Sequence, residues 1–326
     1  MNVGMIGYGF MGGAHLAAMR AIEGVKVKSV VTRTRPSATG PARGNLDLKS
    51  GPLPDDVAWH SVWREVLDDP EIDAVDICLP TDLHKEVTLA ALAAGKHVLC
   101  EKPMALNTAD CDVMLTAAEQ SGRVFMVGQV LRFMFPYRYA ADFVVKAGKD
   151  AVRRCIFQRS AGFPGWGGWL GDEARSGGAI LDLLCHDLDK ALSIFGPPDR
   201  VSAGSQGPVD TVRAALHYSS DLVVQVEGGW FSPETPFSAS FLLETDDQAL
   251  SFEGGGLSRK RAEIVEPIEI PEHDPYADEI AYFVDCCRKN AAPDLCPPAE
   301  SAAAVRLANL VKAARESNGK ELAWQA

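Results

Sequence analysis

Short apolar runs alternate with amphipathic segments through the first part of the chain. Five runs have the length and apolar content of buried strands: 3–6, 25–32, 74–79, 96–99 and 124–127. Four segments show helical periodicity: 11–21, 61–69, 83–94 and 108–120, the last with Asn107 or Thr108 as a cap. Segment 34–58 is rich in Pro and Gly, which predicts mainly loop. The alternation predicts an α/β fold with a doubly wound parallel sheet.

The pattern changes after residue 129. Helices are predicted at 137–146, 178–195, 276–289 and 299–316, and a strand at 151–159. Several strand patterns follow one another directly between 200 and 252. Such an order favours an open, mainly antiparallel sheet in a second α/β domain. We therefore expect two domains, 1–128 and 129–326, which also suits the length of the chain.

A glycine-rich turn separates the first strand from the first helix. It reads Gly7-Tyr8-Gly9-Phe10-Met11-Gly12. Gly7 allows a tight turn, Gly9 lets the backbone approach a pyrophosphate, and Gly12 allows close packing of helix on strand. The helix N-terminus, with Phe10 and Met11, then offers free N–H groups and a positive dipole end to the phosphates. In this context the motif predicts a Rossmann domain that binds a nicotinamide dinucleotide, rather than a purely structural turn.

The end of the second strand bears on which dinucleotide binds. An NAD site usually carries Asp or Glu there, about 20 residues beyond the glycine motif, to hold the ribose 2′-hydroxyl. This chain has Thr32 and Arg33 at that place. A guanidinium matches a 2′-phosphate, whereas a carboxylate would repel it. We expect NADP, with Thr32 and Arg33 as phosphate ligands. NAD is the alternative if Arg33 stacks on the adenine or faces solvent.

Two further segments carry polar groups suited to catalysis. Lys102 follows a predicted strand, at the carboxyl edge where doubly wound sheets bind ligands. The predicted long helix carries Asp182, His186 and Asp189, at spacings that bring side chains to one face. Taken alone, the lysine would be a solvated loop charge and the Asp/His pair a surface ion pair. The apolar neighbours of the pair favour a partly buried face instead: Ile180, Leu181 and Leu184.

With these motifs the sequence resembles the glucose–fructose oxidoreductase, inositol dehydrogenase and MocA (Gfo/Idh/MocA) family. The resemblance covers nearly the whole chain and includes these further segments: 79–84 (LPTDLH), 94–99 (AGKHVL), 127–129 (VGQ) with Arg132-Phe133, and 166–169 (WGGW). It implies a catalytic set of Lys102, within Glu101-Lys102-Pro103, together with Asp182 and His186. It also implies cofactor contacts from further residues: Pro80, Thr81, His84, Glu101 and Lys102.

Three positions depart from the family pattern. Thr32 replaces the usual acidic residue, which changes the expected cofactor. Thr81 stands where many members have Asn, so the loop around His84 can contact the cofactor differently. Leu184 stands where a small residue, often Gly, is usual, and this affects the width of the pocket.

The reaction that fits these groups is hydride transfer between a nicotinamide and a secondary alcohol or ketone. The hydroxyl proton needs a base, and His186 suits this role because the unperturbed pKa of histidine lies near neutrality. Lys102 can hydrogen-bond the same oxygen and stabilise alkoxide charge, and Asp182 would orient the substrate or the imidazole. The resemblance implies a sugar, polyol or inositol substrate. Candidate pocket residues, which plain packing would also explain, are Arg132, Phe163, Trp166 and Trp169.

Composition limits the partners. The net charge of −12 disfavours nucleic acid and anionic membranes, which need clustered Lys and Arg. No apolar run approaches a membrane span, and the start of the chain lacks the features of a signal peptide. The eight cysteines show no paired CxxC spacing, which favours reduced structural thiols over a metal site. We expect a cytoplasmic protein without metal. The resemblance implies a homodimer or homotetramer built through the sheet of the second domain.

Two other functions are open at this point. Some members of the family hydrolyse glycosidic bonds with a tightly held NAD that is oxidised and re-reduced in each turnover. A non-catalytic sensor would bind NAD(P) in order to control a partner protein. Thr32 and Arg33 speak against the hydrolase because they suggest exchangeable NADP. The joint presence of Lys102, Asp182 and His186 speaks against the sensor, which needs no proton relay.

Overall fold

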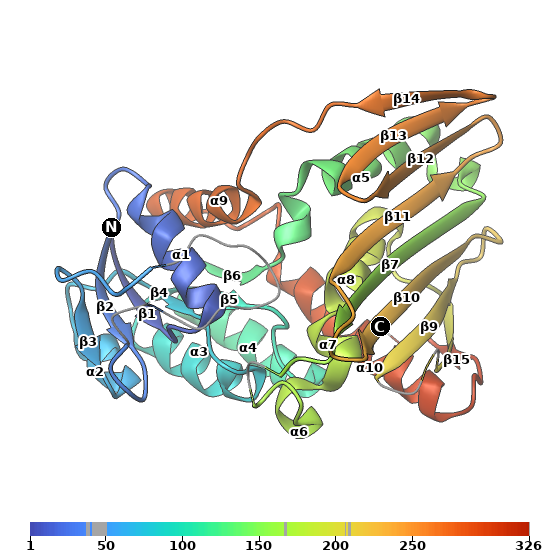
Figure 1. Ribbon diagram of the computed structural model, residues 1–326. Coiled ribbons are helices and arrows are strands. Elements are labelled where there is room, and N and C mark those ends of the chain that lie inside the picture. The colour runs from blue at the N-terminus through green and yellow to red at the C-terminus, as the bar shows by residue number, and fades with distance from the viewer. Residues whose placement is uncertain (37–39, 41–50, 166–167, 206, 208–209, 326) are drawn as a thin grey trace. The chain divides into compact units, whose positions relative to one another are not determined.

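The computed structural model divides into two compact units (Figure 1). The first unit comprises Met1–Val130 and Asp274–Ala302, and the second comprises Leu131–His273 and Ala303–Ala326. Within them, the described residues are 1–36, 40, 51–165, 168–205, 207 and 210–325. The sequence had placed the first boundary two residues earlier, after 128. It had also assigned segment 274–302 to the second domain, whereas the structure places this segment in the first unit.

The first unit is built on a parallel sheet, as predicted. Its strands are β1 (Asn2–Ile6), β2 (Lys26–Val31), β3 (Ala58–His60), β4 (Ala74–Ile77), β5 (His97–Glu101) and β6 (Phe125–Gly128), in the order β3-β2-β1-β4-β5-β6. Its helices are α1 (Phe10–Arg20), α2 (Trp63–Asp68), α3 (His84–Ala93), α4 (Thr108–Ser121) and α9 (Pro275–Lys289). The central strands are buried along their length, which explains their nearly continuous apolar sequence. The predicted cap of α4 is Asn107, whose side chain accepts from the Asp110 N–H at 2.9 Å.

Two features of this unit differ from the sequence expectation. Strand β3 lies at the end of the segment predicted as loop, where it pairs with the free edge of β2. Helix α9 packs against α1 (Figure 1) and buries Ile280 and Phe283 completely. Arg288 of α9 donates to the Glu23 carbonyl oxygen at 2.5 Å. The chain therefore returns to the first unit to cover α1.

The second unit contains the open, mainly antiparallel sheet that the sequence predicted. Its described strands are β7 (Arg154–Gly162), β8 (Arg200–Gly204), β9 (Thr211–His217), β10 (Val223–Phe231), β11 (Ser238–Glu244), β12 (Gln248–Glu253), β13 (Gly256–Arg261), β14 (Ile264–Ile268) and β15 (Leu322–Ala323), in the order β14-β13-β12-β11-β7-β10-β9-β8-β15. Only the β7–β10 pairing is parallel among these. The helices are α5 (Phe135–Ala147), α6 (Glu173–Ser176), α7 (Gly178–Asp182), α8 (Cys185–Phe195) and most of α10 (Pro298–Glu316).

The prediction of one continuous helix over 178–195 is wrong. The structure has α7 and α8 with a break at Leu183 and Leu184. At the break the Leu184 N–H donates to the Ala179 carbonyl oxygen at 3.0 Å, a wider turn than an α-helix makes. Both leucines are buried. We attribute the break to their packing, because the local sequence contains no proline that would end a helix.

Two buried ion pairs connect α8 to its surroundings. Asp187 accepts from the Arg159 guanidinium of β7 at 2.6 and 3.1 Å, and Arg159 also donates to the Tyr137 hydroxyl at 3.2 Å. Asp189 accepts from Arg132 at 2.9 and 2.6 Å. Paired, hydrogen-bonded charges of this kind are the form in which charged groups are tolerated inside a protein.

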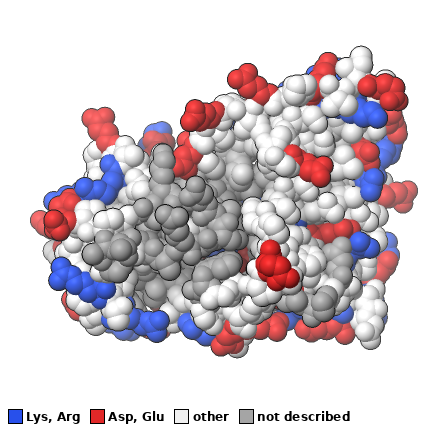
Figure 2. Space-filling view, in the orientation of Figure 1, with Lys and Arg blue, Asp and Glu red and all other residues white. Residues whose placement is uncertain are grey.

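Acidic and basic side chains are interspersed over the face of the molecule in Figure 2. The acidic excess expected from the net charge of −12 is thus spread on this face rather than gathered in one patch. Among the described residues, no helix is both long and apolar enough to cross a membrane.

Candidate active site

The glycine turn lies between β1 and α1, as predicted. Gly7 has a φ of +106°, and a Cβ there would lie 2.2 Å from the Cys78 carbonyl oxygen. A Cβ on Gly12 would lie 2.4 Å from the Gly7 carbonyl oxygen. A Cβ on Gly9 would meet no atom of the described residues within 4 Å. Gly7 and Gly12 are therefore required by the fold of the turn, whereas Gly9 faces open space.

This open space suits a dinucleotide. Gly9 is the N-cap of α1 and provides no side-chain cap, so the first N–H groups of the helix are available to an anion. Phe10 and Met11 are half-buried beside it. Backbone N–H groups, a helix dipole and room at Gly9 together fit a pyrophosphate.

The end of β2 brings Thr32 to the carboxyl edge of the sheet. The Thr32 hydroxyl donates to the Thr34 carbonyl oxygen at 2.5 Å and accepts from the Trp59 indole N–H at 3.0 Å. This fixes the Thr32 side chain against β3. Arg33 is exposed, so its guanidinium can reach a ligand at this edge. Part of the segment that follows, 37–39 and 41–50, lies outside the described residues.

His84 connects the loops that follow β4 and β5. Its ring nitrogens lie 2.8 Å from the Pro103 carbonyl oxygen and 2.9 Å from the Leu79 carbonyl oxygen. Burial lowers the pKa of His84, against the opposing effect of these two hydrogen bonds. Pro80 and Thr81 belong to the loop that His84 fixes, and Thr81 is buried. The predicted cofactor contacts after β4 and β5 therefore form one connected edge.

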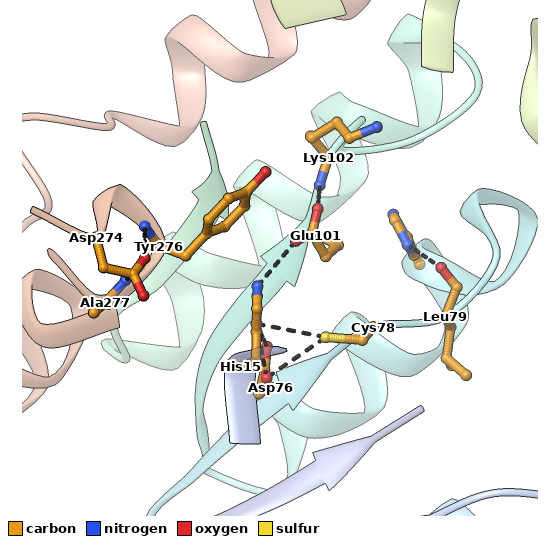
Figure 3. Close-up of polar contacts among 10 residues, drawn as sticks. His15, Asp76, Cys78, Leu79, Glu101, Lys102, Asp274, Tyr276 and Ala277 are labelled. Carbon is orange, nitrogen blue, oxygen red and sulfur yellow. Dashed lines mark hydrogen bonds and ion pairs between the residues drawn. The ribbon is translucent and has the colours of Figure 1, made fainter. Parts of the chain in front are cut away.

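Lys102 follows β5 directly, as predicted. The carboxylate of Glu101, the last residue of β5, turns back and accepts from the Lys102 backbone N–H at 3.0 Å. The other carboxylate oxygen lies 3.1 Å from Nε2 of His15 (Figure 3). Burial raises the pKa of Glu101, but the hydrogen bond and charge of His15, then Lys102, outweigh it and lower that pKa.

Three residues beside this turn were not predicted as site residues from the sequence: His15, Asp76 and Tyr276. Nδ1 of His15 lies 3.0 Å from the Asp76 carboxylate (Figure 3). A lone aspartate within the apolar strand β4 is a signal that could have indicated a buried partner. The Tyr276 hydroxyl points toward the Glu101–Lys102 turn (Figure 3), and burial, with Glu101 and Glu279 nearby, raises the pKa of this phenol to about 12. No local sequence pattern connects α9 with β5.

One buried group has spacing that could suit a metal ion. Atoms of His15, Asp76 and Cys78 lie within 4.8 Å of one another. Nδ1 of His15 and the Asp76 carboxylate are already in hydrogen-bond contact, and the Cys78 sulfur lies 3.5 Å from both side chains. Burial raises the pKa of Cys78 well above its usual range, which keeps the thiol protonated. We therefore interpret this group as a hydrogen-bonded cluster.

In the second unit, Asp182 ends α7 and His186 lies in the first turn of α8. Asp182 and His186 are half-exposed, whereas all the remaining residues from Gly178 to Leu192 are buried. Leu184, at the position where the family usually has a small residue, is completely buried. The pair thus remains accessible although the helix that was expected to hold it is broken.

The predicted pocket residues have different surroundings. Arg132 is buried and pairs with Asp189, so its guanidinium is part of the core of the second unit. Asp189, which the sequence placed on one partly buried face with Asp182 and His186, is completely buried. Trp166 lies outside the described residues, and Trp169 is half-buried.

A cavity of about 410 Å³ lies beside the start of α7, within the second unit. Its aromatic wall includes Phe163 and Trp230, whose rings pack edge to face with centroids 5.6 Å apart. Its polar wall includes Asp210 and Arg315, which form an ion pair at 2.6 Å. The cavity therefore combines aromatic faces with charged groups.

Two models of one family match the chain. The oxidoreductase family with an NAD-binding Rossmann fold matches residues 1–129, and the GFO/IDH/MocA C-terminal domain matches residues 148–250. The fold and these matches define a protein with an NAD-binding Rossmann domain followed by the C-terminal domain of this family. The chain belongs to the Gfo/Idh/MocA family, as its motifs had indicated.

Individual relatives are more distant. Levoglucosan dehydrogenase of Pseudarthrobacter phenanthrenivorans is 29% identical over 218 residues, which are 62% of this chain and 53% of that protein. Myo-inositol 2-dehydrogenase of Thermotoga maritima is 28% identical over 233 residues, 68% of this chain and 66% of that protein. The chain thus spans between about half and two thirds of these curated relatives. Levoglucosan dehydrogenase in complex with NADH has the same fold, with a TM-score of 0.80 at 20% identity over 99% of this chain and 98% of that one.

Proposed function

We propose that the protein is an NAD(P)-dependent dehydrogenase that acts on a secondary alcohol of a sugar, polyol or inositol, or reduces the corresponding ketone. The observation that carries this proposal is the accessibility of Asp182 and His186 within an otherwise buried segment. Lys102 at the carboxyl edge of the first unit's sheet and the open space at Gly9 support it. Titratable groups that are accessible to solvent but surrounded by buried residues are typical of catalytic sites.

The three proposed catalytic residues have separate roles. The nicotinamide ring, when bound, accepts or supplies the hydride. His186 takes the proton of the substrate hydroxyl, and returns it in the reverse direction. Lys102 donates a hydrogen bond to the same oxygen and stabilises the negative charge that develops there. Asp182 orients the substrate or the imidazole.

The preferred cofactor in this proposal is NADP. A 2′-phosphate next to β2 would meet the exposed Arg33 and no carboxylate at position 32. Thr32 is the second proposed ligand, and its hydroxyl would have to release the Thr34 carbonyl oxygen in order to donate to this phosphate. Further proposed cofactor contacts come from the glycine turn and from the loops after β4 and β5: Gly7, Gly9, Phe10, Met11, Gly12, Pro80, Thr81, His84, Glu101 and Lys102.

The substrate is proposed to be polyhydroxylated. The half-buried Trp169 offers aromatic surface for the C–H faces of a sugar ring. Trp166 stays a proposed substrate contact on the sequence alone. The two curated relatives act, by their names, on an anhydrosugar and on an inositol. Arg132 is left out of the proposed substrate contacts, because its guanidinium is already paired with Asp189.

We also propose a homodimer or homotetramer that assembles through the open sheet of the second unit. Exposed or half-exposed residues alternate with buried ones along β9 and β11, so one face of this sheet is available to a partner copy. Light scattering should give a mass of two or four chains of 35.0 kDa. A monomer at micromolar concentration would contradict the assembly, and leave the catalytic proposal intact.

The proposed location is the cytoplasm, because the cysteines are free thiols and a reducing compartment keeps them so.

A spectrophotometric panel tests the catalytic proposal. The purified protein is mixed with NADP⁺, and separately with NAD⁺, and with sugars, inositols and polyols of defined stereochemistry. The proposal expects reduced nicotinamide to accumulate with one stereochemical group, and faster with NADP⁺. Release of sugar from a glycoside without net cofactor change would contradict it and favour a hydrolase.

A further inference from the structure

His15 occupies an unusual electrostatic position in the first unit. It lies on α1, and its side chain is completely buried between carboxylates from two different strands. Nδ1 lies 3.0 Å from Oδ2 of Asp76 on β4, and Nε2 lies 3.1 Å from Oε1 of Glu101 on β5 (Figure 3). One imidazole thus joins the dinucleotide-binding helix to two strands of the sheet.

The two carboxylates, Asp76 and Glu101, determine which protonation state of the His15 imidazole is compatible with its surroundings. A neutral imidazole has one N–H and one acceptor nitrogen, so it would turn a lone pair toward one of the two carboxylates. An imidazolium has two N–H groups, one for each carboxylate: Nδ1 is in hydrogen-bond contact with Asp76, and Nε2 lies at ion-pair distance from Glu101. It also compensates the charge of Asp76 and Glu101, which would otherwise be buried without a partner.

The other titratable groups around His15 agree with this state. Cys78, after β4, faces Nδ1 and stays a thiol because burial raises its pKa. Lys102, after β5, contributes a positive charge that lowers the pKa of Glu101. From α9, Tyr276 and Glu279 face the same turn, and the phenol stays neutral with a pKa of about 12. Burial lowers the pKa of His15, but the contact with Cys78 and the charge and hydrogen bond of Asp76 raise it well above its ordinary value.

Glu101 carries the effect of His15 to the proposed catalytic lysine. One carboxylate oxygen contacts His15 and the other accepts from the Lys102 backbone N–H at 3.0 Å. Fixing the carboxylate therefore fixes the peptide group that begins the Lys102 turn. We propose that His15, as an imidazolium held by Asp76 and Glu101, is a positioning residue that couples the dinucleotide-binding helix to the Lys102 turn. Its catalytic consequence rests on the proposed function.

The protonation state is tested without any substrate. The full chain is labelled with ¹⁵N-histidine, and the His15 signal is assigned by its loss in His15→Gln. We expect both ring nitrogens to be protonated at pH 7 and to stay so above the pH range in which an ordinary histidine loses its proton. A neutral ring at pH 7, or a signal that moves when a chelator removes a bound metal, would overturn the proposal.

A second variant covers the case in which His15→Gln does not fold. Glu101→Gln keeps an oxygen that can accept from the Lys102 N–H, but it removes one of the two charges. We expect His15 in this variant to lose a proton at a lower pH than in the native protein, by one or more pH units. An unchanged His15 titration would overturn the role of Glu101.

The coupling to Lys102 is measured by amide hydrogen exchange of the peptide that contains residues 100–104. In His15→Gln the Lys102 amide should exchange about tenfold faster or more, because the carboxylate that accepts its proton is no longer fixed. Met114→Ala, a core variant on α4, is the control for a general loss of stability. Equal exchange in the native protein and in His15→Gln would overturn the coupling.

Kinetics then separate this inference from the proposed function. In His15→Gln we expect kcat to fall about tenfold or more, while the dissociation constant of NADP⁺ changes by less than about threefold. If the native protein oxidises none of the tested alcohols, the proposed function fails, while the NMR and exchange results still decide the position of Lys102. Native kcat in His15→Gln, with faster exchange at Lys102, would overturn the catalytic consequence alone.

Discussion

Asp182 and His186 are the two half-exposed residues in a segment, Gly178 to Leu192, whose other members are all buried. They stand on either side of the break between α7 and α8, at the end of one helix and in the first turn of the next. A segment packed this tightly leaves little freedom to its two accessible side chains. The relationship therefore gives the proposed acid–base pair a fixed support in the second unit.

The first prediction concerns the proposed proton transfer. His186→Gln and Lys102→Ala should each lower kcat by about 10²–10⁴-fold, because each removes a group that acts on the reacting oxygen. In His186→Gln the cofactor affinity, measured by the quenching of intrinsic fluorescence, should stay within about threefold of the native value. Lys146→Ala, at an exposed position on α5, is the matched lysine control. Full turnover in Lys102→Ala would contradict the proposed catalytic role of Lys102.

Cofactor choice gives the second prediction. Arg33→Ala should weaken NADP⁺ binding about tenfold or more and affect NAD⁺ little, because a charge-assisted hydrogen bond to the 2′-phosphate is lost. Thr32→Asp should reverse the preference, since a carboxylate repels the phosphate and accepts from a 2′-hydroxyl. Isothermal titration with both cofactors measures these affinities, with Arg138→Ala, exposed on α5, as control. Equal losses for both cofactors in Arg33→Ala would point to adenine stacking instead.

The glycine turn gives a third prediction with two opposite outcomes. Gly12→Ala should destabilise the first unit, because its Cβ would lie 2.4 Å from the Gly7 carbonyl oxygen. Gly9→Ala should fold normally, because its Cβ would meet no atom within 4 Å in the described part of the chain, but it should bind the cofactor about tenfold more weakly or worse. Thermal unfolding and cofactor titration of the two variants separate these effects. Unchanged cofactor affinity in Gly9→Ala would contradict a pyrophosphate at this place.

The buried pair of Arg132 and Asp189 gives the fourth prediction. Arg132→Met leaves the Asp189 carboxylate buried without a partner, and should lower the free energy of unfolding by about 3–5 kcal/mol. Arg132→Met combined with Asp189→Leu should recover much of this loss, because no uncompensated charge remains. Urea denaturation measures both. Native stability in Arg132→Met together with a raised KM for the alcohol would instead make Arg132 a substrate ligand.

The fifth prediction is a pH dependence of stability due to His15. Its pKa is raised in the folded protein, so folding takes up a proton above the unfolded pKa of about 6.5. The stabilising contribution is complete below that pH and is lost as pH rises toward the folded pKa. In this range His15 should lower the free energy of unfolding by about 1.4 kcal/mol per pH unit.

The pKa of Glu101 shifts in the other direction. Its lowered pKa gives a contribution that is present above the unfolded value of about 4.3 and is lost as pH falls through the folded one. Urea denaturation between about pH 6.5 and about pH 7.5 lies above the range of Glu101 and below the range in which unfolded cysteines titrate, and comparison with His15→Gln isolates His15. The slope should be smaller in His15→Gln, and identical slopes in the two proteins would contradict the raised pKa.

The sequence predicted the elements whose signals are local. The strands and helices of the first unit, the glycine turn and the position of Lys102 follow from periodicity and from a short motif. Strand β3 was not predicted, because its three residues, Ala58–His60, are too few to show a periodic pattern. It forms by pairing with β2. The break in the helix after Asp182 was not predicted either, because the sequence has no helix-breaking residue there.

Long-range contacts set the limit for the site. His15 lies 61 residues from Asp76 along the chain, and no spacing rule connects them. Tyr276 reaches the β5 turn only because α9 packs on α1, far from its neighbours in sequence. Arg132 was expected to face a substrate, since nothing local indicated that Asp189 would be its buried partner.

The most direct test of the central claim follows the hydride itself. An alcohol that turns over in the panel is prepared with deuterium on the reacting carbon, and the cofactor formed from it is analysed by mass spectrometry. A dehydrogenase that exchanges its cofactor should release NADPH that carries the deuterium, one mass unit heavier, together with the ketone. Unlabelled cofactor, or a hydrolysis product without released reduced cofactor, would contradict the account.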